Sequence, residues 1–392
     1  MGFQKAFEVS EYKRRIADVK NRMDSAGIDM LICQDPANMC WLTGFDGWSF
    51  YTPQAVVLHH SDEWPIWFGR EQDAKSAHMT TDLPAENIFN FSEPLVHHPD
   101  KHPFDELCDL LKSRNCDTGT IGVDFDAHYY TARAHQHLTK GLPNAKIIDN
   151  KELVNWARLV KSSAEVHYMR EAGKLSTLVM NNALDKVKPG MPQSEIMANV
   201  YHDQVLGIDG KFGDYTGLCP LIQVGEGTST PHLTWSSEGL PDSGLVVMEL
   251  GSARRHYNVP VTRTIHIGKP PAEIEKLADV IIEGGNLALE TAKPGATCEE
   301  VEAIFQKTIR RHGYQKNSRV GYSIGLNFPP DWGERTASLR AGDKTELQEG
   351  MCFHFQSGVW LEEYGAAISE PFVVTQTGGE RLCDVPRELI LK

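Results

Sequence analysis

Three residues in the second half of the sequence have side chains suited to acid–base or nucleophilic catalysis. His232 lies in the segment Gly225-Glu-Gly-Thr-Ser-Thr-Pro-His-Leu233, and an imidazole can take up and return a proton near neutral pH. Glu249 and Glu370 lie in apolar, strand-like segments. A carboxylate can hold a cation, activate water or attack an electrophilic carbon. The chain has 16 histidines and 53 acidic residues, so residue type alone does not single out these three, and their choice as candidate catalytic groups rests on the sequence blocks in which they stand.

Four blocks around the two acids resemble the metal-binding blocks of the pita-bread superfamily, which includes methionine aminopeptidases, prolidases and creatinases. The blocks are residues 246–264, 321–326, 347–358 and 368–370. In the superfamily they carry two Asp, one His and two Glu, which bind a dinuclear metal centre. The resemblance places at these five positions Glu249, Pro260, Tyr322, Gln356 and Glu370.

This set of residues is a poor ligand set for a catalytic metal. Proline offers no side-chain donor, an amide oxygen is a weak neutral ligand, and a neutral phenol is a poorer ligand than imidazole. Two separated carboxylates remain, so we expect no metal and no other cofactor. One alternative stays open, a single ion bridged by Glu249 and Glu370.

Without a metal, protein groups must activate the nucleophile and stabilise charge. Metal-free creatinase does this with carboxylates that hold a guanidinium and a histidine that moves protons. By this resemblance, His232 protonates the departing nitrogen and Glu249 faces a cationic amidine. Glu249 either attacks the amidine carbon itself or activates a water molecule that does so. A buried carboxylate needs such a cation opposite it. Glu370 is the third expected catalytic residue.

Among superfamily members that lack metal ligands, the chain is similar to the ectoine hydrolases. This implies a small zwitterionic substrate, ectoine, whose cyclic amidine ring is opened to N-acetyl-2,4-diaminobutyrate during its degradation, with a deacetylase as a possible functional partner. Three alternatives remain. They are a creatinase-type amidinohydrolase for another guanidino or amidine compound, a metal-dependent Xaa-Pro peptidase, and a non-catalytic solute-binding protein.

Aromatic residues near the N-terminus are candidates for binding the substrate cation. The segment from Asp35 to Phe45 resembles the Asn-x-x-Tyr-Leu-Thr-Gly-Phe segment of creatinase relatives, and Phe45, Trp48 and Tyr51 lie in or just after it. Aromatic rings attract delocalised cations. In relatives a loop of one subunit reaches the site of the other, so the resemblance implies a homodimer.

Polar residues in the second half complete the expected binding site. Tyr322 and Gln356 stand at former ligand positions, so we expect them to form hydrogen bonds with the substrate. Arg335 and Thr336 contact the substrate on the superfamily pattern. Arg263 could bind a carboxylate as a fork, but pairing with a buried acid is the favoured interpretation.

The pattern of apolar residues predicts two domains. Residues 1–150 alternate helices and strands, with a helix over 11–25 and strands at 29–33, 55–59 and 120–124, and form an α/β domain. Residues 151–392 form an α+β domain of the pita-bread type, with strands at 246–251, 259–266 and within 351–374. Its helices are expected at residues 157–187, 193–206, 274–291 and 298–312.

Composition excludes several classes of partner. The 392 residues carry a formal net charge of −14, which argues against nucleic acid or an anionic membrane surface. No apolar run is long enough to span a membrane and the N-terminus lacks an apolar signal core, so we expect a cytoplasmic protein. The eight cysteines lack a Cys-x-x-Cys pair, which indicates free thiols.

Overall fold

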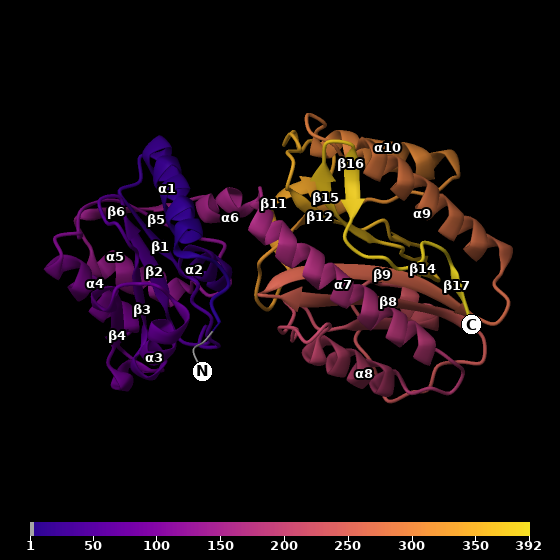
Figure 1. Cartoon of the computed structure of the whole chain (residues 1–392), viewed down its shortest axis with the longest axis horizontal. Helices are drawn as coiled ribbons and strands as arrows, with labels where there is room; N and C mark the ends of the chain where they lie inside the picture. The colour runs from indigo at the N-terminus through magenta and orange to yellow at the C-terminus, as the bar shows by residue number, and fades with distance from the viewer. Residues whose placement is uncertain (1–3) are drawn as a thin grey trace. The chain divides into compact units, whose positions relative to one another are not determined.

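The computed structural model describes residues 4–392, which form two compact units (Figure 1). The first unit ends at Arg158 and the second runs from Leu159 to Lys392. We expected the boundary after residue 150. The first unit extends eight residues further because helix α6 (Leu153–Arg158) packs against α1 (Val9–Ala26) and α2 (Pro36–Thr43). The described residues contain no helix that is both long and apolar enough to cross a membrane.

The first unit is an α/β domain, as expected. Its mixed sheet has the strand order β4-β3-β2-β1-β5-β6, with β1 antiparallel to β2 and parallel to β5. The strands are β1 (Met30–Cys33), β2 (Ala55–His59), β3 (Ile66–Arg70), β4 (Ile88–Phe91), β5 (Gly119–Val123) and β6 (Ala145–Asp149). The remaining helices are α3 (Glu71–Thr80), α4 (Pro103–Ser113) and α5 (Ala132–Gly141), with short 3-10 turns η1 (Ala85–Asn87) and η2 (Glu93–Leu95).

Helix α1 confirms the prediction from residue spacing. Its apolar residues recur every three or four positions, at Tyr12, Ile16, Val19 and Met23, and all four are buried. The helix ends at Gly27, whose φ of 65° is the left-handed conformation that glycine adopts without strain.

The second unit is the expected α+β domain and contains two larger sheets. The first sheet has the order β17-β9-β8-β7 and the second has the order β11-β10-β12-β15-β16. The strands of the first are β7 (Leu221–Val224), β8 (Gly244–Arg254), β9 (Tyr257–Ile267) and β17 (Ile390–Leu391). Those of the second are β10 (Gly321–Ile324), β11 (Gly333–Leu339), β12 (Cys352–Phe355), β15 (Glu370–Thr375) and β16 (Gly378–Arg381). A small hairpin joins β13 (Val359–Trp360) and β14 (Gly365–Ala366).

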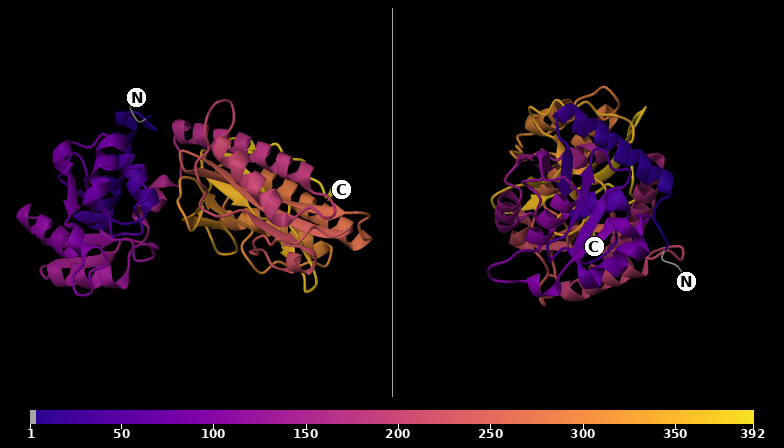
Figure 2. Two further views of the ribbon diagram at one scale, coloured as in Figure 1. Left: turned by 90° about the horizontal axis from the view of Figure 1, so that it is seen from below. Right: turned by 90° about the vertical axis from the view of Figure 1, so that its left-hand side faces the viewer.

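Helices cover both sides of these sheets (Figure 1). Helix α7 (Ser163–Lys186) packs on β8 and β9, and α8 (Gln193–Leu206) packs on α7 and β8. Figure 2 shows these two helices over the long strands when the molecule is seen from below. Helices α9 (Ala272–Thr291) and α10 (Cys298–Arg311) pack on each other and on the second sheet.

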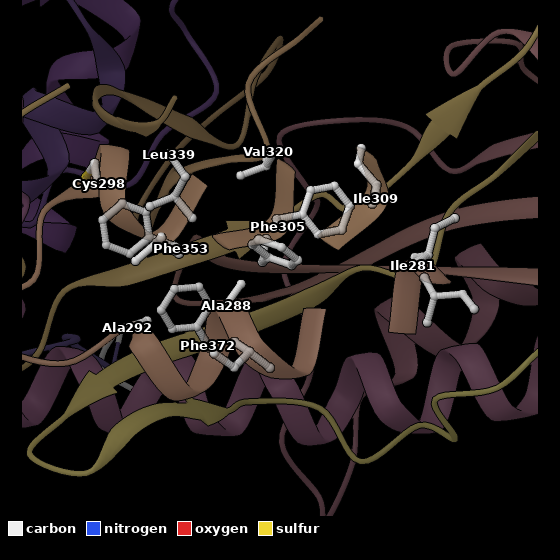
Figure 3. Close-up of a cluster of buried hydrophobic side chains, with 14 of the residues drawn as sticks. Ile281, Ala288, Ala292, Cys298, Phe305, Ile309, Val320, Leu339, Phe353 and Phe372 are labelled. Carbon is white, nitrogen blue, oxygen red and sulfur yellow. The ribbon is translucent and has the colours of Figure 1, made fainter. Parts of the chain in front are cut away.

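Between α9, α10 and the second sheet lies a large apolar core (Figure 3). Phe305 and Ile309 of α10, Ala288 of α9, Phe353 of β12 and Phe372 of β15 are all buried in it. Because its aromatic and aliphatic side chains pack closely, this core gives a rigid support to β10, β12 and β15. These strands carry part of the candidate site, including Tyr322 and His354, and β8 and β9 carry the rest.

Our prediction of one long helix at the start of the second domain is wrong in part. The sequence from 157 to 187 was expected to form a single helix, but α6 ends at Arg158 and α7 begins at Ser163. Val160 pairs with Met351 as an isolated bridge, and the backbone nitrogen of Lys161 donates to Gly350. The hydroxyl of Ser162 then caps α7 together with Glu165, so tertiary pairing and a capping box interrupt the helical pattern.

Candidate active site

The site is built around Glu249, which lies near the middle of β8. Its strand neighbours are Leu221 on β7 and Thr262 on β9. The Glu249 residue is only 7% exposed, and this burial raises the pKa of its carboxyl group to about 7. A hydrogen bond from Gln356 and the charge of Lys316 act in the opposite direction. At neutral pH this carboxyl group therefore lies close to its point of half-ionisation.

A chain of hydrogen bonds lies beside this carboxyl group. The Nε1 of Trp332 donates to the Tyr322 hydroxyl (2.8 Å), which lies 3.0 Å from Nδ1 of His354. The Nε2 of His354 lies 2.7 Å from Oγ of Ser369, and its Nδ1 lies 4.0 Å from the Glu249 carboxylate. Burial lowers the pKa of His354 to about 3, so its imidazole is neutral.

The phenol oxygen of Tyr322 accepts from Trp332, and the hydroxyl oxygen of Ser369 accepts from the backbone nitrogen of Thr262 (2.7 Å). Each hydroxyl faces one ring nitrogen of His354, and a neutral imidazole accepts a hydrogen bond at one nitrogen and donates at the other. His354 therefore links Tyr322 to Ser369 in either tautomer. Burial also raises the pKa of Tyr322 well above its ordinary value, so the phenol stays neutral.

Lys316 is the buried cation of the site. It is 6% exposed, and its Nζ donates to the carbonyl oxygen of Gly358 (2.7 Å) and lies 4.3 Å from the centre of the Trp360 ring. Burial lowers the pKa of Lys316 to about 7, against the opposing effect of the Glu249 charge. A β-carbon at position 358 would lie 2.4 Å from the Trp360 indole, so glycine permits this close packing.

The structure places the expected binding residues Gln356 and Tyr322 near Glu249. The Nε2 of Gln356 donates to Oγ1 of Thr262 (3.3 Å), and its Oε1 is buried with no hydrogen-bond partner among residues 4–392.

Sequence reasoning missed His354 and Lys316. His354 lies two residues before Gln356, and side chains two apart in an extended segment point to the same side, so that alternation could have revealed it. Lys316 lies in a loop, where no pattern marks it.

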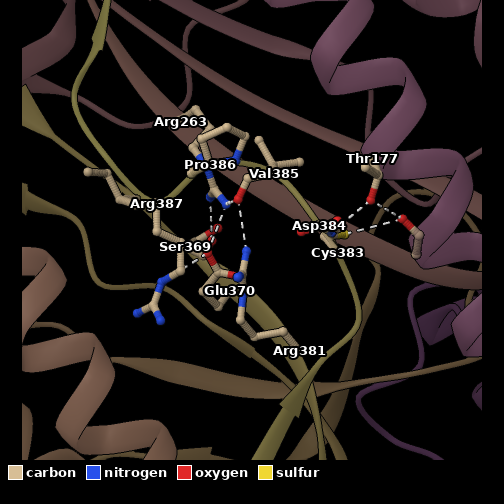
Figure 4. A network of polar contacts seen from close by, with 12 residues as sticks. Thr177, Arg263, Ser369, Glu370, Arg381, Cys383, Asp384, Val385, Pro386 and Arg387 are labelled. Atoms are coloured by element: carbon tan, nitrogen blue, oxygen red, sulfur yellow. Dashed lines mark hydrogen bonds and ion pairs between the residues drawn. The ribbon is translucent and has the colours of Figure 1, made fainter.

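The expected catalytic residue Glu370 has a different environment (Figure 4). Its carboxylate is fully buried and pairs with Arg263 (2.8 Å), Arg381 (2.8 Å) and Arg387 (3.4 Å). Three guanidinium groups around one carboxylate satisfy its charge. The three pairs hold Glu370 within the fold, and its catalytic role stays a prediction. Arg263 has the buried acidic partner that we favoured.

The former metal positions do not form a ligand set. Pro260 lies opposite Gly251 in β9 and has no donor, the Tyr322 hydroxyl is occupied by Trp332 and His354, and Glu370 is enclosed by arginines. Among the described residues no three His, Cys, Asp or Glu side chains gather in a way that could hold an ion. A dinuclear centre does not fit these residues.

His232 lies in an exposed segment after η3 (Gly225–Ser229). The carbonyl of the next residue, Leu233, accepts hydrogen bonds from the Ile222 backbone (3.2 Å) and the Gln223 side chain (3.0 Å). Both donors belong to β7, which pairs with β8 at Glu249. The segment that carries His232 is thus tied to the strand beside Glu249.

Arg335 and Thr336 both lie on β11. The hydroxyl of Thr336 is 2.8 Å from that of Ser323 on β10, and Arg335 has a φ of 58°. A positive φ is uncommon for a residue other than glycine, and such residues cluster at functional sites. Neither residue is fully buried, so both side chains reach partly accessible space.

The three expected aromatic residues belong to the first unit. Phe45 is 3% exposed and its ring lies 5.1 Å from that of Trp67, so it is buried within that unit, and its contact with the substrate stays a prediction. Trp48 and Tyr51 are 57% and 56% exposed. The Tyr51 hydroxyl accepts a hydrogen bond from Arg70 (3.1 Å). Two of the three rings are therefore available at the surface of the first unit.

Comparison with known proteins identifies the family. Residues 167–376 match Metallopeptidase family M24, and residues 15–160 match the Creatinase/Prolidase N-terminal domain. The chain belongs to the M24 family. Prolidase from Thermococcus sibiricus has the same pita-bread fold, with a TM-score of 0.84 at 18% identity over 97% of this chain and 99% of that one.

Three curated relatives of this M24 protein match nearly all of it. An uncharacterised hydrolase/peptidase of Sinorhizobium fredii is 40% identical over 386 residues, 98% of both chains. The ectoine hydrolase of Halomonas elongata is 38% identical over 393 residues, again 98% of both. A Xaa-Pro dipeptidase of Pyrococcus furiosus is 24% identical over 96% of this chain and 100% of its own. The M24 protein is therefore a hydrolase.

Proposed function

We propose that this hydrolase opens the cyclic amidine ring of ectoine, without a metal, to give N-acetyl-2,4-diaminobutyrate. The observation that carries the proposal is a buried carboxylate, Glu249, at a former metal position whose partner positions hold Pro260, Tyr322 and Gln356. An amidinium supplies the positive charge that such a carboxylate lacks. The similarity to the Halomonas elongata ectoine hydrolase supports the choice of substrate.

In the proposed reaction Glu249 is the nucleophile. Its carboxylate oxygen forms a bond to the amidine carbon, and the bond from this carbon to one ring nitrogen then breaks. The departing nitrogen keeps the bonding electrons and takes a proton from His232. Water then attacks the same carbon, returns one proton to His232 and gives its other proton to the remaining nitrogen. The bond to Glu249 breaks, which releases the carboxylate and leaves this nitrogen as an acetamide. Activation of water by Glu249 is the alternative route to the same product.

The surrounding groups orient the substrate. Tyr322 and Gln356 are held by hydrogen bonds beside Glu249, while Arg335 and Thr336 contribute contacts from β11. The exposed rings of Trp48 and Tyr51 contribute cation–π contacts. We further propose that the protein is a cytoplasmic homodimer whose acetylated product passes to a deacetylase.

A direct test compares three substrates after treatment with EDTA. We expect the chelated protein to add one water to ectoine, detected by mass, and to leave creatine and a Xaa-Pro dipeptide unchanged. Dipeptide cleavage restored only by a divalent metal would contradict the proposal and indicate a peptidase. Turnover of creatine would indicate the amidinohydrolase alternative, and binding of ectoine without turnover would indicate a solute-binding protein.

A further inference from the structure

The buried site contains two opposite charges that do not pair with each other. The ammonium of Lys316 is held by the carbonyl of Gly358, two residues beyond Gln356, and the Gln356 side chain donates to Thr262, the strand neighbour of Glu249. Within the described part of the chain no ion pair joins Glu249 and Lys316, although each shifts the pKa of the other. Among the described residues, the basic side chain within ion-pair distance of Glu249 is that of His354, at 4.0 Å, and its imidazole is neutral. The ammonium of Lys316 contacts a carbonyl oxygen and an aromatic ring, and no carboxylate.

This arrangement is incomplete in electrostatic terms. Isolated buried charges are unfavourable, and both groups show it through pKa values displaced toward their neutral forms. A ligand with a cation at one end and a carboxylate at the other would satisfy both groups at once. Electrostatic complementarity of this kind gives specificity for the ligand.

We propose that Lys316 binds the carboxylate of a zwitterionic substrate whose cationic amidine faces Glu249, and that Lys316 thereby selects carboxylate-bearing amidines. The position of its ammonium is fixed by the Gly358 carbonyl and the Trp360 ring, which leave its remaining hydrogens free to donate. This inference rests on the proposed function for the orientation of the amidine.

Arg263, which could also have bound the substrate carboxylate, already has partners within the fold. Arg263 donates to Glu370 and to the backbone carbonyls of Thr262, Ser369, Val385 and Pro386, so its guanidinium is used within the fold (Figure 4). Lys316 is therefore compared below with Arg335, the arginine that the superfamily pattern predicts to contact the substrate.

The test measures affinity for two ligands. The first is ectoine and the second is 2-methyl-1,4,5,6-tetrahydropyrimidine, which has the same cyclic amidinium and no carboxylate. Dissociation constants are measured by calorimetry in a His232→Ala background, in which the departing nitrogen cannot be protonated and ectoine is not consumed. The proteins compared are this parent, which takes the place of the wild type, and its Lys316→Met, Lys316→Arg and Arg335→Met variants. We expect Lys316→Met to weaken ectoine binding about 10- to 100-fold, the effect of one lost charged hydrogen bond. The analogue should bind both proteins equally, and Lys316→Arg should keep part of the preference for ectoine.

Each outcome decides the inference. Equal weakening for both ligands would show that Lys316 only supports the fold, and an unchanged ectoine affinity would exclude any contact. Loss of the ectoine preference in Arg335→Met alone would assign the carboxylate to Arg335. Since these are binding constants, they remain informative if ectoine is not hydrolysed by the wild type, a result that would overturn the proposed reaction alone. If the His232→Ala parent binds no ectoine, both proposals fail.

Discussion

At the scale of single residues, burial of Glu249 links activity to pH. The carboxyl group must be ionised to attack, and its pKa is about 7. We therefore expect kcat/KM for ectoine to fall as the pH is lowered through about 7. With an exposed glutamate in this role, the fall would occur near pH 4.3 instead. The measurement is a pH profile of initial rates. An acid limb near pH 4 to 5 would contradict a buried nucleophile.

The same burial affects stability. The folded pKa of about 7 exceeds the ordinary 4.5, so the folded protein binds the extra proton between these values. The contribution of this proton to the free energy of unfolding is fully present below pH 4.5 and is lost as the pH rises through 7. The loss is roughly 3 kcal/mol at most.

We therefore expect Glu249→Gln to abolish turnover and yet to unfold with a free energy at least equal to that of the wild type at about pH 8, since it removes the buried charge. Denaturant unfolding at several pH values checks this. The exposed Glu362→Gln should change neither property.

The sequence predicted part of the residue-level site. Glu249, Tyr322 and Gln356 were found because they stand in short blocks with fixed spacing. Glu370 was placed in the same way, but its three arginines come from β9, β16 and the C-terminal segment, and no local pattern reveals such a pairing. Lys316 was missed because burial of a loop lysine depends on the tertiary fold.

At the scale of elements, the Glu370 network joins β9, β15, β16 and the segment after residue 381. Removing its central charge leaves Arg263 buried without its acidic partner, which is strongly unfavourable. We expect Glu370→Gln to lower the unfolding free energy by about 3–5 kcal/mol. A matched control is Glu380→Gln, which breaks an exposed pair with Arg170 and should cost no more than about 1 kcal/mol.

The decisive comparison is between stability and catalysis in these two variants. A Glu370→Gln protein as stable as the wild type but with a much lower kcat would support the catalytic role that we expected. Denaturant unfolding and ectoine turnover, measured on the same preparations, separate the two roles.

Elements with a strong local pattern were predictable and others were not. The β8–β9 hairpin and helix α1 followed from apolar runs and helical spacing. Helix α2 was missed because it has only eight residues and is buried on nearly all sides, so it lacks an amphipathic pattern. The break between α6 and α7 depends on a bridge to Met351, far away in the sequence.

At the scale of the whole molecule, each of the two units has apolar packing of its own. In the first unit, side chains of the six-stranded sheet and of α4 and α5 form a core, and in the second unit those of α9, α10 and the second sheet do. Two compact units in a chain of 392 residues agree with the usual size limit of single domains, which is why length and pattern together favoured a division.

The expected homodimer leads to a prediction about the assembled protein. If a loop of one subunit supplies Trp48 to the site of the other, then Trp48→Ala and Glu249→Gln are defects in different subunits. Each variant alone should have a low kcat/KM, the first because a cation–π contact is lost and the second because the nucleophile is gone.

Refolding an equal mixture of the two variants should give mixed dimers in half of the cases, each with one intact site. The mixture should therefore recover about a quarter of the wild-type activity. Trp156→Ala removes another partly exposed tryptophan and should be fully active alone. A mixture that stays inactive while mixed dimers are detected by mass would show that each site takes both residues from one chain.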